Sequence, residues 1–361
     1  MYKTYKKAGV DTKGEEIALK RIIEICHSTY GLRRSKIGES VLPIKHFAGI
    51  VKITPELGIA IKTDGVGTKV LIAQMMDEYD TIGIDCIAMN VNDIICVGAE
   101  PTTFVDYIAI ERVDAEMLEE IAKGLARGAE MAKVAIVGGE IAQLPEIIRG
   151  KGTGKGLDLS GACIGAVSLD KIVKGDDLKE GDVVLGLRSS GIHSNGLTLA
   201  RKVLLKDADL KIDAYIDKLD RTLGEELLEP THIYVPEVLR MLEEGLDVKV
   251  LAHITGDGLL NLNRVAEGFG YVIEDLPKPQ PIFELIQEYG GIADEEMYRV
   301  FNMGVGFCVV LPREEIDDAC QIADKHKVES FVMGYATKDP LERVVLKPVG
   351  LERTGVKFRK L

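Results

Sequence analysis

The sequence predicts a protein of two domains of the α/β or α+β class. Its 361 residues correspond to two domains of about 150 to 200 residues, because a single hydrophobic core rarely organises a longer chain. Strand-like apolar runs alternate with helix-length segments, which favours layers of helices on sheets. A charged, turn-rich passage at residues 170–182 separates two strand-like runs. We therefore expect one domain over residues 1–172 and a second over residues 173–361.

The individual elements follow from apolar periodicity and from glycine and proline positions. We expect strands at residues 58–63, 102–110, 134–139 and 161–169, and helices at residues 81–97 and 115–131. The helix at 81–97 is apolar almost all round, so it should be buried, and Gly98 and Pro101 terminate it. The second half shows a strand at 183–187, a glycine loop, a helix at 197–205, and a further helix that opens at the sequence HITGDGLL, residues 253–260.

Composition limits the classes of partner. Hydrophobic residues make up 46% of the chain and charged residues 29%, which is typical of a globular protein with real cores. The net charge of −13 opposes binding to nucleic acid or to anionic membranes, so a small-molecule substrate is expected instead. The longest apolar stretch, residues 82–99, contains two Asp and two Asn residues. These would be costly in lipid, so no transmembrane segment is predicted.

The cysteines and the N-terminus favour a reducing compartment. Six cysteines lie mostly inside apolar runs and form no C-x-x-C pair, so buried free thiols are expected. The sequence MYKTYKKAGVD lacks an apolar region of the secretory type. We therefore expect a cytoplasmic protein.

The stretch AIKTDGVGTKVLIA, residues 60–73, allows two interpretations. Asp64-Gly65 between two apolar runs is typical of a tight β-hairpin turn. Alternatively, Asp64 ends a strand, and Gly65 and Gly67 let backbone N–H groups approach a ligand, with Lys69 as a counter-charge for phosphate.

Further acidic groups could join Asp64. Asp85, Asn92 and Asp93 fall within one quadrant of the helix at 81–97. Such buried groups either form an internal polar network or bind a cation such as Mg²⁺, which takes oxygen ligands from separate segments. Glu140 follows Gly138 and Gly139 at a strand end, and Asp106 lies inside another strand. Together these acids predict an ATP–Mg²⁺ site without a Walker loop, whose sequence pattern the glycine-rich residues 150–158 do not match.

The second half offers two glycine-rich helix starts. The sequence SSGIHSNG, residues 189–196, contains Gly191, His193, Ser194 and Asn195. Backbone N–H groups at such a position can bind an anion, although Ser194 or Asn195 could instead be an ordinary N-cap. His253 of HITGDGLL could be a buried packing residue. We find no Ser-His-Asp spacing and no Cys/His cluster typical of zinc.

A set of motifs spread over residues 4–310 resembles the phosphoribosylformylglycinamidine cyclo-ligase (aminoimidazole ribonucleotide synthetase) family. In chain order they are TYKKAGVD, TDGVGTK, DTIGIDCIAMNVNDIICVGAEP, FVDYIA, VGGEIAQLP, GLRSSGIHSNGLTLARK, LLEPTHIYV, AHITGDG and EMYRVFNMGVG. The resemblance implies a homodimer whose N-terminal domains join their strands into a shared barrel. It also implies a C-terminal α/β domain that completes the active-site cleft.

The resemblance further implies an ATP-dependent, C–N bond-forming ligase of purine biosynthesis. ATP would phosphorylate the formyl amide oxygen of formylglycinamidine ribonucleotide, and the amidine nitrogen would then close the imidazole ring of aminoimidazole ribonucleotide. The chemistry is reasonable, because phosphate leaves far more readily than an amide oxygen, and Mg²⁺ stabilises the transferring phosphoryl group. Two alternatives are an ATP-dependent phosphotransferase of the same superfamily, similar to thiamine-monophosphate kinase, and a non-catalytic nucleotide-binding relative.

Residue roles are carried over by position, as the resemblance implies them. The metal ligands would be Asp64, Asp93 and Glu140, with Asp257 as an additional candidate. The ATP-binding residues would be Gly65, Gly67, Thr68, Lys69, Asp93, Gly138, Gly139 and Glu140. The substrate-binding residues would be Asp106, Gly191, His193, Ser194, Asn195 and Thr255. The catalytic residues would be Asp64, Lys69, Asp93 and His193, the last as the candidate for proton transfer.

Three positions depart from the family pattern. Only Gly49 stands where the family usually has several glycines before its first strand, in a loop that covers the nucleotide. Ile141 replaces a threonine after Glu140, which removes a hydroxyl group. Asp257 replaces a glycine, and its carboxylate would repel phosphate unless it binds Mg²⁺. Asp257 is also the observation that motivates the phosphotransferase alternative.

Overall fold

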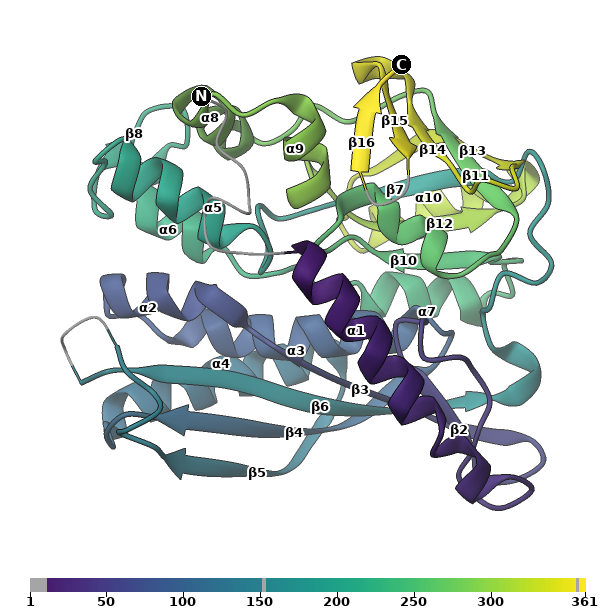
Figure 1. Ribbon diagram of the computed structural model, residues 1–361, viewed down its shortest axis with the longest axis horizontal. Helices are drawn as coiled ribbons and strands as arrows, with labels where there is room; N and C mark the ends of the chain where they lie inside the picture. Colours follow the sequence, from purple (N-terminus) through teal and green to yellow (C-terminus); the bar gives the residue numbers. More distant parts are fainter. Residues whose placement is uncertain (1–11, 151–153, 355–356) are drawn as a thin grey trace.

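A computed structural model describes residues 12–150, 154–354 and 357–361 of the chain. The motif TYKKAGVD and residues 151–153 of the glycine-rich loop lie outside these ranges. The described chain forms two large sheets, each with its own helices, and one sheet lies above the other in Figure 1. This arrangement has the two-domain, mixed α and β character that the sequence predicts.

The first sheet has six strands in the order β1-β2-β3-β6-β4-β5, all antiparallel to their neighbours except the parallel pair β4 and β5. Its strands are β1 (Glu39–Ser40), β2 (Gly49–Lys52), β3 (Leu57–Gly65), β4 (Glu100–Ile110), β5 (Ala135–Gln143) and β6 (Leu157–Ser168). The accompanying helices are α1 (Thr12–His27), η2 (Tyr30–Arg33), η3 (Gly67–Lys69), α2 (Val70–Met76), α3 (Asp80–Ile95), α4 (Ala115–Ala132) and η4 (Leu169–Lys171). The helices α3 and α4 cover one face of this sheet (Figure 1).

The second sheet has eight strands in the order β10-β12-β7-β13-β11-β14-β15-β16. Its strands are β7 (Val183–Arg188), β10 (Val250–His253), β11 (Phe269–Ile273), β12 (Val305–Leu311), β13 (Ser330–Lys338), β14 (Val344–Leu346), β15 (Leu351–Thr354) and β16 (Lys357–Lys360). A small hairpin comprises β8 (Tyr215–Ile216) and β9 (Arg221–Thr222). The helices are α5 (Leu197–Arg201), the π-helix η5 (Lys202–Asp207), α6 (Leu223–Leu228), α7 (Val235–Glu243), η6 (Gly258–Arg264), α8 (Pro281–Gly290), α9 (Asp294–Val300), η7 (Arg313–Glu315), α10 (Ile316–Lys325) and η8 (Lys347–Val349).

The helix α3 is the buried axis of the first domain, as its apolar composition predicts. Every residue from Ile82 to Ile95 is buried. It crosses α4 so closely that a Cβ atom on Gly124 would lie only 1.8 Å from the Asp80 carbonyl oxygen. The second domain packs α7 onto α3 and α4. The polar side chains of α3 therefore lie at the junction of the two domains.

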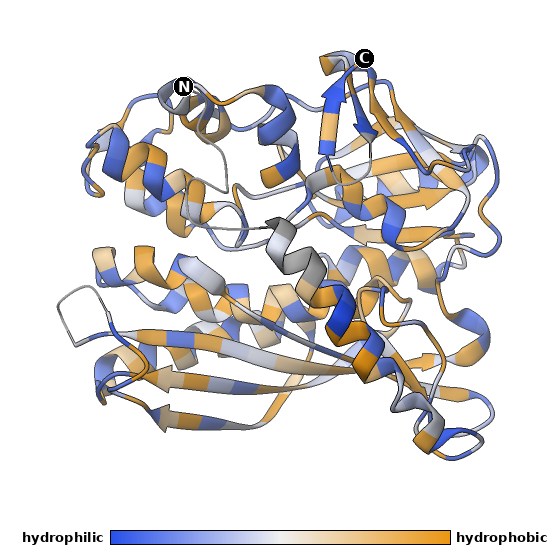
Figure 2. Cartoon of the chain, viewed as in Figure 1, coloured by the Kyte–Doolittle hydropathy of each residue, from blue (hydrophilic) through white to orange (hydrophobic). Residues whose placement is uncertain are grey.

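The face of the first sheet that lies away from α3 and α4 remains open. It exposes apolar side chains, namely Leu57, Ile61, Val105, Tyr107 and Ile164, and the neighbouring edge strand β5 exposes Ile136, Val137 and Ile141. Figure 2 shows hydrophobic segments along β4, β5 and β6, with no helix of the described residues beneath them in this view. So large an exposed apolar surface is typical of a face that another protein surface covers.

The helices found among the described residues are too short or too polar to cross a membrane. Four of the six cysteines, Cys86, Cys96, Cys163 and Cys308, are buried, and all six are free thiols. The expectation of mostly buried free thiols is therefore confirmed.

The hairpin interpretation of Asp64-Gly65 is wrong. Both residues still belong to β3, where Asp64 pairs with Gly161 and Gly65 with Ser160 of β6. The chain then passes through η3 into α2 rather than turning back as a strand. The second apolar run buries Val70, Ile72 and Ala73 as a helix, so the turn residues link a strand to a helix.

Candidate functional site

A charged cluster surrounds Asp93 where the two domains meet. Asp93 projects from α3, Lys62 from β3 and His253 from the end of β10. The Lys62 ammonium lies 2.7 Å from Asp93 Oδ2, and His253 Nδ1 lies 2.8 Å from Asp93 Oδ1. Burial alone would raise the pKa of Asp93, but the His253 hydrogen bond and the charge of Lys62 outweigh it and lower that pKa. Asp93 is therefore a buried, charged carboxylate.

Lys62 links Asp93 to Asp64. Its ammonium lies 3.4 Å from Asp64 Oδ2 in addition to its contact with Asp93. Burial opposes its charge, but the two carboxylates prevail and raise the pKa of Lys62. Asp64 and Asp93 therefore converge on one cation, which here is the lysine ammonium. Asp64 and Asp93 are therefore the carboxylates that could hold a divalent cation if Lys62 moved aside.

Lys69 does not lie at an open phosphate site in this arrangement. The residue is fully buried, and its ammonium lies 2.9 Å from Asp85 Oδ1. It also donates a hydrogen bond to the Glu229 carbonyl oxygen. Asp85 Oδ1 additionally accepts hydrogen bonds from the Thr231 amide at 2.8 Å and the Thr231 hydroxyl at 2.6 Å. Through these hydrogen bonds to Glu229 and Thr231, the first-domain pair Lys69 and Asp85 binds the second domain.

Asn92 has a similar linking role on the same helix. Its Oδ1 accepts a hydrogen bond from the Tyr234 amide at 2.9 Å, and its Nδ2 donates to the His232 carbonyl oxygen at 2.8 Å. The polar quadrant of α3 is thus divided. Asp85 and Asn92 make internal polar contacts, one of the two roles expected for this quadrant. Asp93 instead contacts Lys62 and His253.

The two glycine-rich loops of the second domain reach this junction. The Ser194 hydroxyl donates to Asp85 Oδ1 at 3.2 Å. Asn195 Oδ1 lies 3.5 Å from the position that a Cβ atom on Gly256 would occupy, so the SSGIHSNG and HITGDGLL loops are adjacent. Neither Ser194 nor Asn195 caps α5: Gly196 holds the N-cap position at φ +84°, with no capping side chain. The N-cap alternative is therefore wrong, because the chain turns there with a left-handed glycine.

The first glycine loop lies beside these two. The Thr68 hydroxyl, in the segment DGVGTK, lies 3.0 Å from the Thr198 hydroxyl of α5. Gly65, at the end of β3, donates its amide to Asp64 Oδ1 at 2.8 Å. The structure thus brings the predicted residues Asp64, Gly65, Thr68 and Asp93 to the same interdomain region as the second-domain loops.

His193 is buried in a left-handed turn, at φ +65°. Its Nε2 accepts a hydrogen bond from the Ser190 amide at 3.1 Å, whereas its Nδ1 is buried without a partner in the described chain. Burial, with smaller effects of His253, Lys69 and His232, lowers the pKa of His193 well below its usual range. The ring is therefore neutral and, because Nε2 accepts a hydrogen bond, the unpartnered Nδ1 carries its proton.

Glu140 lies apart from the other predicted acids. It pairs in register with Tyr107, whose side chain is on the open face of the first sheet, opposite to α3. Asp106 lies beside Gly139, and burial raises the pKa of its carboxyl group. One copy of the chain does not bring Glu140 together with Asp64 and Asp93. Within the described ranges, no three Asp, Glu, His or Cys residues are grouped to hold a metal ion.

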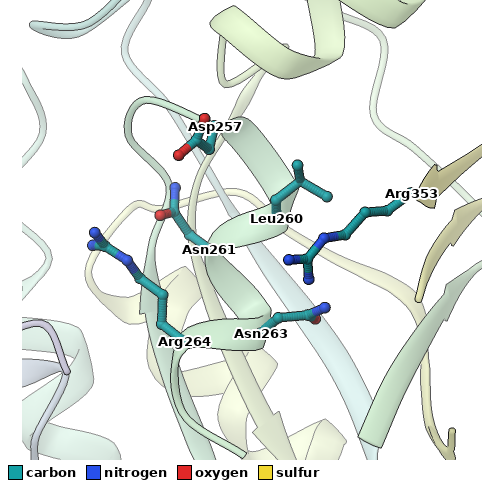
Figure 3. Close-up of a pocket in the computed structure, with 6 residues that line it drawn as sticks. All are labelled: Asp257, Leu260, Asn261, Asn263, Arg264 and Arg353. Atoms are coloured by element: carbon teal, nitrogen blue, oxygen red, sulfur yellow. The ribbon is translucent and has the colours of Figure 1, made fainter. Parts of the chain in front are cut away.

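A separate cavity of about 160 Å³ lies beside the HITGDGLL loop (Figure 3). Asp257, at φ +75°, precedes η6, and Thr255 is half-buried in the same loop. The lining residues are Asp257, Leu260, Asn261, Asn263, Arg264 and Arg353. The guanidinium of Arg264 lies 5.0 Å from the centre of the Phe47 ring of the first domain.

Lys62 and Arg264 lie at this junction but are not identified in the sequence analysis. The contact of His253 with Asp93 is also not predicted there. Lys62 stands two residues before Asp64, and strand alternation puts the two on one face of β3, so the signal was present. No local pattern places Arg264 beside Phe47 or His253 beside Asp93, because each pair comes from segments more than 150 residues apart.

Two domain families match the chain. Residues 45–167 match the AIR synthase related protein, N-terminal domain, and residues 179–347 match the AIR synthase related protein, C-terminal domain. Among curated relatives, the phosphoribosylformylglycinamidine cyclo-ligase of Methanothermobacter thermautotrophicus is 48% identical over 319 residues, which cover 88% of this chain and 90% of the relative. The cyclo-ligase of Pyrococcus horikoshii is 47% identical over 348 residues, covering 96% and 99% respectively.

Solved structures share the fold at low sequence identity. A structure described as AaThiL complexed with AMPPCP and TMP has a TM-score of 0.61 and 18% identity, with 92% of this chain and 95% of that chain covered. A thiamine-monophosphate kinase from Stenotrophomonas maltophilia has a TM-score of 0.59 and 16% identity, with coverage of 86% and 92%. With both domains matched and near-full-length relatives at 47–48% identity, this chain belongs to the AIR synthase related protein family.

Proposed function

We propose that this protein is a phosphoribosylformylglycinamidine cyclo-ligase of purine biosynthesis. The observation that carries the proposal is its similarity, over nearly the full length, to curated proteins of that name. The charged cluster around Asp93, at the junction of the two domains, supports it. The enzyme uses ATP to convert formylglycinamidine ribonucleotide into aminoimidazole ribonucleotide.

The reaction proceeds in two steps. The formyl amide oxygen attacks the γ-phosphorus of ATP, ADP leaves, and the oxygen becomes part of an iminophosphate. The amidine nitrogen then attacks the carbon that carries this oxygen, and inorganic phosphate leaves with it as the imidazole ring closes. The first step needs cationic groups and N–H donors around the transferring phosphoryl group.

We assign the phosphate end of ATP to the region of Asp64, Gly65, Gly67, Thr68 and Asp93. Mg²⁺ would be held by Asp64 and Asp93, which already converge on the Lys62 ammonium, and would neutralise charge on the transferring phosphoryl group. Lys62 then moves from the carboxylates toward the phosphates. Lys69 keeps its ion pair with Asp85 and orients the glycine loop that precedes it, a positioning role instead of direct contact with phosphate.

The nucleotide substrate lies on the second-domain side of the cleft. Its contacts come from the two adjacent glycine loops, through Gly191, Ser194, Asn195 and Thr255. His193 stays neutral with its proton on Nδ1, so at that nitrogen it donates to the substrate instead of accepting a proton, and it contributes no positive charge. Asp106 stays assigned to the substrate, on the first sheet.

The active unit is a homodimer formed through the open face of the first sheet, whose strands then complete a shared barrel. The edge strand β5 adjoins this face and carries Gly138, Gly139 and Glu140. In the dimer these residues approach the partner copy. The partner's strands would then cover the exposed side chains Val105 and Tyr107. The net charge of −13 accords with a cytoplasmic enzyme that binds neither nucleic acid nor membrane.

The phosphotransferase alternative is not favoured. The relatives that are about half identical to this chain carry the cyclo-ligase name, whereas the thiamine-monophosphate kinase structure is only 16% identical and shows a common fold alone. Asp257, the residue that favours the alternative, lines a separate cavity beside η6.

The proposal is tested by ADP release from the purified protein with formylglycinamidine ribonucleotide or thiamine monophosphate as acceptor. We expect turnover with the ribonucleotide alone, together with appearance of the aminoimidazole product. Turnover with thiamine monophosphate alone would establish the kinase instead. Absence of turnover with either acceptor, in a protein that still binds ATP, would establish a non-catalytic nucleotide-binding protein.

A further inference from the structure

The cavity beside η6 contains charged groups that the proposed reaction does not use (Figure 3). Its volume of about 160 Å³ is below the roughly 300–1,000 Å³ of sites that enclose a whole drug-sized ligand. The cavity therefore fits one end of a nucleotide. Two guanidinium groups, two carboxamides and one carboxylate line it, so that end must be polar and must offer both an anion and hydrogen-bond donors.

Arg264 supplies the available positive charge. It is exposed, and within the described part of the chain its guanidinium forms no ion pair. Its guanidinium nevertheless contacts the first domain, because it lies 5.0 Å from the centre of the buried Phe47 ring. Its charge also acts on Lys62, whose pKa it lowers slightly against the effect of the two carboxylates. Arg264 is therefore a preset cation at the edge of the Asp93 cluster.

The other polar residues of the cavity shape its wall. Asn261 is buried and donates hydrogen bonds to the carbonyl oxygens of Gly256 at 3.0 Å and Gly258 at 2.9 Å, which fixes the turn that carries Asp257. Arg353 Nη1 donates to the Glu342 carbonyl oxygen at 3.4 Å, and Asn263 donates to the same oxygen. Asn261 and Arg353 thus hold the wall of the cavity that Arg264 and Asp257 also line.

Asp257 has an exposed carboxylate with no hydrogen bond or ion pair within the described ranges. Figure 3 shows it on the opposite side of the Asn261 amide from Arg264. No ion pair joins these two residues in the described chain, although their charges are opposite. A site for phosphate alone would be weakened by this carboxylate, whereas a sugar phosphate can use both groups, since carboxylates commonly accept hydrogen bonds from ribose hydroxyls.

We propose that this cavity binds a ribosyl phosphate, with Arg264 contacting the phosphomonoester and Asp257 accepting hydrogen bonds from the ribose hydroxyl groups. The inference rests on the proposed function, in which the substrate carries a 5-phosphoribosyl group. It gives Asp257 a role in substrate binding in place of a role as a metal ligand. Arg264 then fixes the substrate end that does not react, while the formyl group extends toward Asp93.

The direct test is calorimetric titration of the full-length protein with ribose 5-phosphate and, separately, with inorganic phosphate. Arg264→Met retains the apolar contact with Phe47 but removes the charge, so its affinity for both ligands should fall about ten- to hundredfold, the usual effect of losing charge-assisted hydrogen bonds. Asp257→Asn suits a left-handed position and should weaken only ribose 5-phosphate binding. Arg313→Met removes an exposed arginine outside the cavity and should change neither affinity.

Two results would overturn the assignment. The first is that Arg264→Met binds ribose 5-phosphate as tightly as the wild type does. The second is that Asp257→Asn weakens the binding of ribose 5-phosphate and of inorganic phosphate equally, because Asp257 would then not contact the ribose. Steady-state kinetics give a second readout: Arg264→Met should raise the KM for formylglycinamidine ribonucleotide and leave the KM for ATP unchanged. If the wild type fails to turn over that substrate yet Arg264→Met loses ribose 5-phosphate binding, the proposed reaction fails and the binding site stands.

Discussion

At the scale of single residues, the balance of charge around Asp93 determines what the site can do. A buried carboxylate held charged by Lys62 and His253 is costly to desolvate, and such groups are typical of functional positions. Lys62 also contacts Asp64, so one cation already occupies the space between the two carboxylates. Their availability to a divalent cation therefore depends on Lys62 moving aside.

Asp93→Asn tests this account of the charge. The amide retains the shape of the side chain but cannot offset the charge of Lys62 or bind Mg²⁺ as a carboxylate does. We expect substrate-dependent ATP turnover to fall at least about a hundredfold, with the circular dichroism spectrum of a folded protein. Asp209→Asn makes the same chemical change at an exposed side chain and should leave turnover unchanged. Retained activity in Asp93→Asn would make this carboxylate structural.

The buried His193 predicts a pH dependence of stability. Burial lowers its pKa in the folded protein below the unfolded value of about 6.5. Below about pH 6.5, His193 binds a proton in the unfolded chain but not in the folded protein. Its contribution to the free energy of unfolding is therefore complete above this pH. The contribution is lost as the pH falls, by up to about 1.4 kcal/mol per pH unit. Urea unfolding of wild type and His193→Asn from about pH 7.5 to about pH 5 measures this difference. Parallel pH profiles would contradict the assignment of a neutral, buried ring.

The sequence identified the acidic residues of the site better than its cations. Asp64 stands beside a glycine at a strand end, and Asp93 stands beside an asparagine on an apolar helix. A carboxylate at such a position is costly without a partner, so both residues are predictable from sequence. The position of Lys69 after the glycine loop predicts a contact with phosphate, yet its ammonium pairs with Asp85 on the helix α3. Lys62 looked like an ordinary strand residue. Local patterns indicate where a charge lies but not which distant residue faces it.

At the scale of elements, α3 connects the domains through its polar quadrant. Asp85 accepts hydrogen bonds from Lys69 and from Thr231, and Asn92 holds the backbone at His232 and Tyr234. These contacts fasten the segment between α6 and α7 to the first domain. The relative position of the loops that carry Ser194 and Thr255 therefore depends on a helix of the other domain.

Lys69→Met tests whether this lysine is a positioning residue. Removal of one partner of a buried ion pair leaves Asp85 charged and unpaired, so we expect the free energy of unfolding to fall by about 3–5 kcal/mol. The double variant Lys69→Met/Asp85→Asn should recover part of this loss. Wild-type stability with a raised KM for ATP would instead show that Lys69 contacts phosphate, as the sequence first indicated.

Element boundaries were predictable where one local pattern decides them. The helices expected at residues 81–97 and 115–131 are observed at Asp80–Ile95 and Ala115–Ala132. Apolar composition with Gly98 after the first helix, and an apolar stripe with Asp114 as the N-cap of the second, decide them locally. The turn at Asp64-Gly65 was misjudged because the strand partner of β3 is β6, almost one hundred residues further along the chain. A pairing of that range leaves no trace in a short window of sequence.

At the scale of the whole molecule, we expect the open face of the first sheet to be covered by a second copy of the chain. Apolar side chains on β3, β4 and β6 are exposed in a single copy, although a soluble chain rarely leaves such a surface uncovered. Two copies that pack through this same face, related by a two-fold axis, would bury the apolar side chains of both. We therefore expect sedimentation velocity to show a dimer.

Val105→Glu places a charge in the centre of that face and should convert the dimer into a monomer, because an unpaired buried carboxylate opposes association. Its neighbours in register, Gly138 and Ala162, carry no charge, so the folded monomer should tolerate the change. Leu341→Glu, at an exposed position of the second domain, serves as the matched control and should remain dimeric. A dimer in both variants would place the interface elsewhere.

The most direct test of the central claim is the fate of the formyl oxygen. Formylglycinamidine ribonucleotide labelled with ¹⁸O at the formyl group is converted with ATP, and the inorganic phosphate is analysed by mass spectrometry. Cyclisation through the phosphorylated amide oxygen predicts one ¹⁸O atom in each phosphate and none in ADP. Unlabelled phosphate accompanying the aminoimidazole product would contradict this account.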